Sequence, residues 1–105
     1  SRAYYTKGSD YFKAGKKRVK INDWAGAKQM WELATKDEKT KVKGRALYNL
    51  ALAAEMDGDL EGASELAKDA YRKCDNRKSM TYRNILEQRI RDQERLKEQM
   101  EGAEK

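Results

Sequence analysis

The chain has 105 residues with 24 basic and 18 acidic side chains, a net charge of +6, and neither histidine nor proline. Its length fits a single domain, and the lack of histidine excludes Ser-His-Asp and Cys-His catalysis as well as histidine-ligated metals. With one cysteine, Cys74, no intrachain disulfide can form, and no apolar run approaches the roughly 20 residues that span a bilayer.

Helix-forming residues dominate the sequence and β-branched residues are few, so we predict an all-α fold. Asn and Gly tolerate the left-handed backbone of tight turns, which we place at Asn22-Asp23 and at Asp57-Gly58-Asp59. Two charged stretches, residues 35–43 and 74–78, are expected to be loops. The expected helices are residues 9–21, 24–35, 44–56, 60–73 and 79–102.

The first two helices are expected to form a hairpin that the next two repeat, with an offset of 36 residues. In this alignment Asp23 corresponds to Asp59, and Gly26 corresponds to Gly62. Small side chains at matched positions allow two helix axes to approach to about 8–10 Å. The expected crossing pairs are Gly15 with Ala27 and Ala51 with Ala63. The larger side chains expected to pack around them are Tyr11, Trp24, Trp31, Leu47, Leu50, Leu60, Leu66 and Tyr71.

The second hairpin carries the pattern LYNLA at residues 47–51, DGDLEGA at residues 57–63, and alanines at positions 67 and 70. This pattern resembles the tetratricopeptide repeat (TPR), and the resemblance covers about residues 9–90. It implies an all-α, TPR-like right-handed α-solenoid in one domain, residues 1–105. Two helix-turn-helix repeats are expected at about residues 9–43 and 44–78. Repeat 1 departs from the family pattern at Ala14 and Arg18, where Leu and an aromatic residue are usual.

Two repeats leave an apolar face open, so such a solenoid needs a cap at its end. The C-terminal helix, about residues 79–102, is expected to be this cap. Its front half carries a helical stripe made of Tyr82, Ile85, Leu86 and Ile90. Beyond Ile90 the stripe fades, and we expect the end of the helix to project from the body or to fray.

In TPR folds the first helices of successive units line a concave groove, so the resemblance implies a binding site there. Mixed aromatic, basic and amide side chains suit an extended peptide. The groove residues expected from the pattern are Phe12, Lys16, Val19, Lys20, Arg45, Tyr48, Asn49, Leu52, Glu55, Arg83, Asn84 and Glu87. One TPR mode clamps a C-terminal carboxylate with two Asn and several basic residues. Only Asn49 matches that mode, so the resemblance does not support it here.

A calcium loop is suggested by Asp57, Asp59 and Glu61, but Lys68 stands where a bidentate Glu is needed. We interpret the segment as a repeat turn and predict no metal. Cys74 is expected in a loop with no histidine to activate it. No catalytic constellation is present, so we predict that the protein is not an enzyme and needs no cofactor.

Residues 1–45 hold 13 basic and 5 acidic side chains. Four lysines share one face of the first helix: Lys13, Lys16, Lys17 and Lys20. Such a face attracts an acidic peptide, phosphate or nucleic acid, or it is simply solvated. Arg18 lies on the apolar stripe, where its stem covers apolar surface while its head reaches solvent or an acid. Trp24 and Trp31 are expected to pack in the core.

We therefore predict a non-enzymatic protein-protein interaction or scaffold module that binds a partner segment in the groove. The alternative is a structural tail that stabilises a larger protein or a homo-oligomer. A third hypothesis is nucleic-acid binding through the basic N-terminal face, although no recognised motif supports it. The whole chain also resembles the TPR-bearing tail of uncharacterised bacterial cell-envelope lipoproteins, which implies a location in the cell envelope or periplasm.

Overall fold

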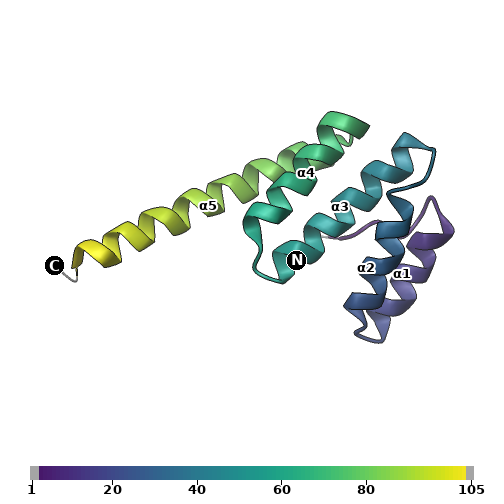
Figure 1. The fold of residues 1–105 in the computed structure, drawn as a ribbon, viewed down its shortest axis with the longest axis horizontal. Coiled ribbons are helices and arrows are strands. Elements are labelled where there is room, and N and C mark those ends of the chain that lie inside the picture. Colours follow the sequence, from purple (N-terminus) through teal and green to yellow (C-terminus); the bar gives the residue numbers. More distant parts are fainter. Residues whose placement is uncertain (1–2, 104–105) are drawn as a thin grey trace.

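The computed structural model describes residues 3–103, so four residues of the predicted domain 1–105 lie outside it. Within that range the elements are α1 (Asp10–Lys20), α2 (Trp24–Ala34), α3 (Thr40–Met56), α4 (Leu60–Cys74) and α5 (Arg77–Ala103) (Figure 1). No strand occurs between residues 3 and 103, and the predicted all-α fold is confirmed.

Each helix packs mainly against its neighbours in the sequence. The hairpins α1–α2 and α3–α4 lie side by side through the contact of α2 with α3, and α5 packs against α4 (Figure 1). The C-terminal half of α5 leaves the body and projects from it. Within residues 3–103, no helix combines the length and the apolar character that crossing a bilayer requires.

Two predicted loops are shorter than expected. Helix α3 begins at Thr40 rather than at residue 44, because buried Val42 extends the stripe of Ala46 and Leu50 by one turn. Cys74 is the last residue of α4 rather than part of a loop. Only two residues then join α4 to α5, and the first of them, Asp75, takes the left-handed conformation that ends a helix, with φ 53°.

The two hairpin turns have the same construction. Asn22 and Gly58 adopt positive φ angles of 60° and 82°. The next residue in each turn is an aspartate whose carboxylate accepts a hydrogen bond from a glycine N–H three residues on, at 2.9 Å in both cases. This is the N-cap interaction that satisfies a free donor at a helix start. A Cβ atom at Gly26 or Gly62 would overlap the capping carboxylate, so glycine leaves the cap its room.

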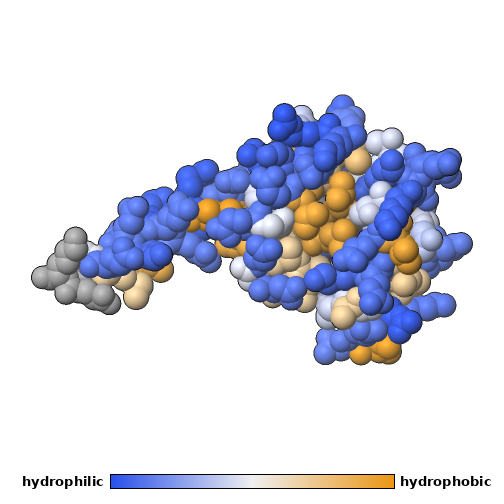
Figure 2. Space-filling model, in the orientation of Figure 1, coloured by the Kyte–Doolittle hydropathy of each residue, from blue (hydrophilic) through white to orange (hydrophobic). Residues whose placement is uncertain are grey.

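The interior consists of two apolar clusters. The first lies among α1, α2 and α3 and contains Phe12, Ala27, Trp31, Ala34, Val42, Ala46, Leu50 and Ala53. The second lies among α3, α4 and α5 and contains Tyr48, Ala51, Leu52, Leu60, Ala63, Ala67, Tyr82 and Leu86. Two half-buried side chains, Tyr4 and Leu66, pack against both clusters. Figure 2 shows apolar surface over the body, whereas the projecting end of α5 is mostly hydrophilic.

Several interior residues differ from the prediction by one position along the helix. Tyr11 and Tyr71 were expected in the interior, but each is 37% exposed. Phe12, expected to face outward, is instead fully buried. The burial of Ala51 and Ala63 in one cluster agrees with their predicted pairing. Gly15 lies against the indole of Trp31, because a Cβ at Gly15 would lie 2.5 Å from Trp31 Nε1.

The first half of α5, where a cap was predicted, packs against the body. Tyr82 and Leu86 are buried and Ile90 is half-buried, whereas every residue from 91 to 103 is exposed. Glu55 of α3 ties this half to the body, because it accepts a hydrogen bond from the Tyr82 hydroxyl at 2.6 Å and pairs with Arg89. The expected projection is therefore confirmed, and the projecting part remains helical to residue 103.

Candidate functional site

An extended segment, residues 3–9, precedes α1 and crosses the face of α3 that carries Arg45 and Asn49. Tyr5 N–H donates to Asn49 Oδ1 at 2.7 Å, and Asn49 Nδ2 donates to the Tyr5 carbonyl at 2.9 Å. One buried amide thus satisfies both backbone groups of one residue, because an Asn side chain offers an acceptor and a donor together. This pair of hydrogen bonds involves only backbone atoms of Tyr5, so it does not depend on which side chain the bound residue carries.

A second contact lies one turn earlier on α3, where Arg45 Nη1 donates to the Lys7 carbonyl at 2.8 Å. Because residues four apart share one face of a helix, Arg45 and Asn49 form a row of backbone-binding groups. Gly8 allows the close approach, since its φ is 107° and a Cβ there would lie 2.7 Å from Arg45 Nη1. The segment therefore runs antiparallel to α3.

Two side chains of this segment, Tyr4 and Tyr5, pack against aromatic rings of the helices. Tyr4 packs against Trp24 and Trp31, with ring centroids 6.1 and 5.7 Å away. Tyr5 meets Tyr48 edge-on at 5.2 Å, and Tyr48 in turn packs against a ring of α5. Aromatic pairs of this kind stabilise by about 0.5–1.5 kcal/mol each beyond the area they bury. Residues 3–9 are therefore held by apolar contact as well as by hydrogen bonds.

Two cations lie close to the Tyr5 ring. The guanidinium carbon of Arg45 lies 4.9 Å and the ammonium of Lys78 lies 5.3 Å from its centroid, within the range of cation–π attraction. Asn76 Nδ2 donates to the Tyr5 hydroxyl at 3.2 Å. Beside this ring is a cavity of about 390 Å³ that the starts of α3 and α5 help to line.

Comparison with known proteins gives one family. Residues 13–90, more than half of the chain, match the profile described as Domain of unknown function (DUF6340). The chain belongs to this family. No match was found among curated proteins or among solved structures. In the DUF6340 chain the matched range takes in α1 from Lys13 on, α2, α3, α4 and the packed half of α5. Residues 3–12 and the projecting half of α5 lie outside it.

The DUF6340 chain does not present all the predicted groove residues to solvent. Four of them are buried, namely Phe12, Tyr48, Asn49 and Leu52. Tyr48 and Asn49 are covered in part by Tyr5, whose position on α3 no sequence pattern indicated. Phe12 and Leu52 belong to the two apolar clusters. The outward orientation expected for Phe12 and Leu52 was therefore wrong. Tyr48 and Asn49 face residues 3–9 on α3, and partner binding at this face stays a prediction.

The remaining predicted residues lie in separate places. Lys16 and Lys20 are exposed on α1, and Val19 packs against the first cluster. Glu55 is engaged with α5 as described above. Of the twelve residues, the structure brings together only Arg45, Tyr48 and Asn49 around the extended segment.

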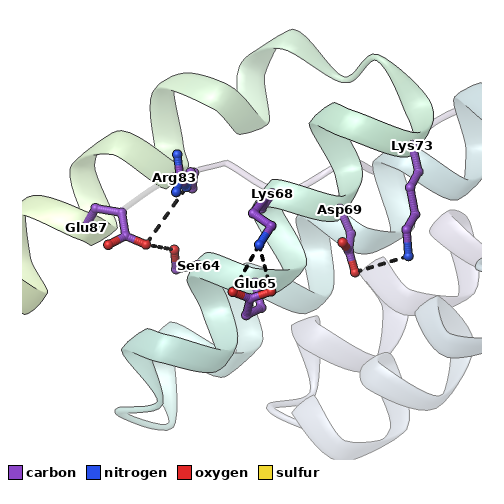
Figure 3. Close-up of polar contacts among 7 residues, drawn as sticks. All are labelled: Ser64, Glu65, Lys68, Asp69, Lys73, Arg83 and Glu87. Atoms are coloured by element: carbon purple, nitrogen blue, oxygen red, sulfur yellow. Dashed lines mark hydrogen bonds and ion pairs between the residues drawn. The ribbon is translucent and has the colours of Figure 1, made fainter.

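Three predicted residues of α5 face α4 instead of the groove. Arg83 and Asn84 line a cavity of about 430 Å³ between these helices, together with Lys68 of α4. Glu87 accepts a hydrogen bond from Ser64 at 2.6 Å and lies 3.9 Å from Arg83 Nε (Figure 3). Lys68 in turn pairs with Glu65 at 3.4 Å, so two of the three cations that line this cavity, Lys68 and Arg83, have acidic neighbours.

Sequence reasoning missed Tyr4, Tyr5, Asn76 and Lys78 as members of the site. The available signal was the pair of aromatic residues ahead of α1, followed by Gly8. That pair has no helical period, so it predicted neither a helix face nor a binding contact.

Other candidate groups have structural roles. Asp59 caps α4, and Asp57 pairs with Lys28 at 3.5 Å. No group of three metal-ligating side chains is found among residues 3–103. Burial raises the pKa of the Cys74 thiol above its ordinary value, although Lys43 and Lys73 oppose this shift. The Arg18 guanidinium lies 3.4 Å from the Asp23 carboxylate, so its head reaches an acid, one of the two outcomes expected for it.

Proposed function

We propose that this DUF6340 chain is a non-enzymatic protein-interaction module, a TPR-like α-solenoid that binds an extended segment of a partner protein on α3. The observation that supports it most is the pairing of the Asn49 amide with both backbone groups of Tyr5. A surface that holds its own chain in this way has the hydrogen-bonding groups to hold another chain. The equivalent turns of the two hairpins support the repeat interpretation.

In this proposal residues 3–9 are a resident occupant of the groove. They are tethered to α1, so they act at a high effective concentration, of the order of millimolar for a short linker. A partner segment must therefore bind better than residues 3–9 do, or reach the groove when they are released. The groove has separate places for the backbone, at Asn49 and Arg45, and for aromatic side chains, at Trp31 and Tyr48.

Removal of residues 1–7 provides a direct test. The shortened chain should bind a fluorescent peptide with the sequence of residues 3–9, AYYTKGS, in a saturable manner measured by fluorescence anisotropy. Asn49→Ala should weaken this binding at least about fivefold, because two hydrogen bonds to the peptide are lost, each contributing about 0.5–1.5 kcal/mol.

Gln29→Ala is the matched control, since Gln29 is an exposed amide on α2 that is not part of the groove. Circular dichroism would establish that each variant is folded. A folded, shortened chain that does not bind the peptide, or that binds it equally well without Asn49, would exclude this function.

A structural role in a larger protein or a homo-oligomer is the second candidate. It is favoured by Tyr71 and Met80, which are 37% and 41% exposed at the outer edge of α4 and α5. Sedimentation equilibrium tests self-association through this edge. If the chain dimerises there, Tyr71→Glu should make it monomeric without affecting peptide binding at Asn49.

A further inference from the structure

The cavity beside Tyr5 carries an excess of positive charge. Its lining includes four cations, Lys41, Arg45, Arg77 and Lys78, and a single carboxylate, Asp75. Within residues 3–103 none of these four cations forms an ion pair. The cavity between α4 and α5 differs, because Lys68 and Arg83 there have Glu65 and Glu87 as neighbours (Figure 3).

Two helices begin at this cavity with charges of the sign that disfavours them. A helix N-terminus has a partial positive charge, which acidic residues stabilise and basic residues destabilise. The first turns of α3 and α5 contain no acidic residue, and Lys41, Arg77 and Lys78 stand there instead. The N-cap of α3, Lys39, also gives no side-chain hydrogen bond. Negative charge in the cavity would relieve this repulsion.

The resident segment does not supply that negative charge. Residues 3–9 contain Lys7 and no acidic side chain. They use the backbone contacts of Asn49 and Arg45 and the aromatic contacts of Tyr5. Arg45 meets the Tyr5 ring and the Lys7 carbonyl, and Lys78 meets the rings of Tyr5 and Tyr48. Asp75 is the single carboxylate that lines the cavity with them.

We propose that the groove is built for an acidic, extended segment of a partner protein, and that this segment displaces residues 3–9. Its aromatic side chain takes the place of Tyr5, and its carboxylates lie next to that position among Lys41, Arg45, Arg77 and Lys78. This inference rests on the proposed function. It adds the chemistry of the partner and a role for residues 3–9 as an occupant that neutral or basic segments do not replace.

A peptide is favoured over nucleic acid as the acidic ligand because the cavity adjoins the backbone-binding row. Tyr5 both pairs with Asn49 and lines the cavity, so one extended chain reaches both. A single-stranded nucleic acid would instead use a basic track along its backbone with stacked bases. The Asn49 amide bonds the N–H and the C=O of one and the same residue, and a peptide backbone offers this pair of groups.

The test compares two fluorescent peptides on the full chain, AYYTKGS and its acidic counterpart AYYEEGS, which differs at the positions of Thr6 and Lys7. At about 0.05 M salt, the acidic peptide should bind at least about tenfold more tightly, and this preference should shrink steeply at high salt. Hydrogen exchange at the Tyr5 N–H should accelerate when AYYEEGS binds, because residues 3–9 leave Asn49.

Lys41→Glu combined with Arg77→Glu should remove the preference for AYYEEGS. This double variant should not unfold the chain, since it places acids at two helix N-termini, where they are stabilising. Lys13→Glu combined with Lys17→Glu is the matched control, because it changes the net charge equally on the exposed face of α1. The control should keep the preference to within about twofold.

Each outcome decides the matter. Equal binding of both peptides, with Asn49→Ala still weakening both, would overturn the acidic partner and leave the groove function standing. If the Lys13→Glu and Lys17→Glu control also loses the preference, the preference depends only on the net charge of the chain, and the proposal of an acidic site at this cavity is wrong. If a single-stranded RNA binds through Lys41 and Arg77 more tightly than AYYEEGS does, the proposed peptide partner is wrong and the ligand is a nucleic acid. Failure of the shortened chain to bind any peptide would remove the proposed function itself.

Discussion

At the scale of single residues, Gly15 and Trp31 set how closely α1 and α2 approach. Trp31 is fully buried, and its Nε1 has no hydrogen-bond partner within the described part of the chain. The indole fills the space where a side chain at position 15 would be. The sequence pattern correctly required a small residue at position 15, but it did not identify Trp31 as the neighbour, because a pattern of positions does not show how far a large ring reaches.

Gly15→Ala should therefore destabilise the fold. The added Cβ would lie 2.5 Å from Trp31 Nε1, and a buried indole has no room to move aside. We expect the free energy of unfolding to fall by about 1–3 kcal/mol, even though alanine favours helix by up to about 1 kcal/mol over glycine. Urea denaturation measures the change. Gly102→Ala is the control, because no atom lies within 4 Å of a Cβ there, and it should be neutral or slightly stabilising.

At the scale of helices, the positions of the turns were predictable because they depend on local chemistry. Asn22 and Gly58 take the left-handed conformation that the sequence indicated, and the aspartates that follow cap the next helices. The start of α3 was not predictable from charge, since the burial of Val42 outweighs the polar residues around it. Local sequence signals thus determine where the tight turns lie, whereas packing determines the length of the loop between α2 and α3.

Helix α5 should divide into a half that stabilises the fold and a half that does not. Leu86→Ala should cost about 2–5 kcal/mol, because this side chain is fully buried against α3 and α4. Deletion of residues 92–105 should change the free energy of unfolding by less than about 0.5 kcal/mol, since surface changes of this kind have small effects. Thermal unfolding of both variants measures the contrast. A deletion as costly as Leu86→Ala would contradict the division.

At the scale of the whole molecule, the all-α arrangement of five helices was predictable, but the extended segment on α3 was not. The contact of Tyr5 with Asn49 joins residues 44 positions apart, and no period or spacing connects them. Residues 3–9 therefore cover Arg45, Tyr48 and Asn49 of α3, three of the residues expected to line a groove. Arg83 and Asn84 were placed with it because the pattern could not show that their part of α5 turns toward α4.

Tyr4→Ala combined with Tyr5→Ala should weaken the connection between the two apolar clusters. Tyr4 packs against both clusters, and Tyr5 packs against the second. We expect a loss of about 2–4 kcal/mol and a broader unfolding transition, followed by tryptophan fluorescence and by far-UV circular dichroism. Tyr11→Ala is the control, because Tyr11 is 37% exposed and should cost less than about 1 kcal/mol.

The exposed end of α5 also matters for how the molecule can be handled. At 1.5 Å per residue, the helix beyond Ile90 extends about 20 Å away from the packed body. A sensor chip, dye or bead linked near Gly102 would be kept clear of α3 by this natural spacer. Surface plasmon resonance with such end-on attachment should report the same affinities as measurements in free solution.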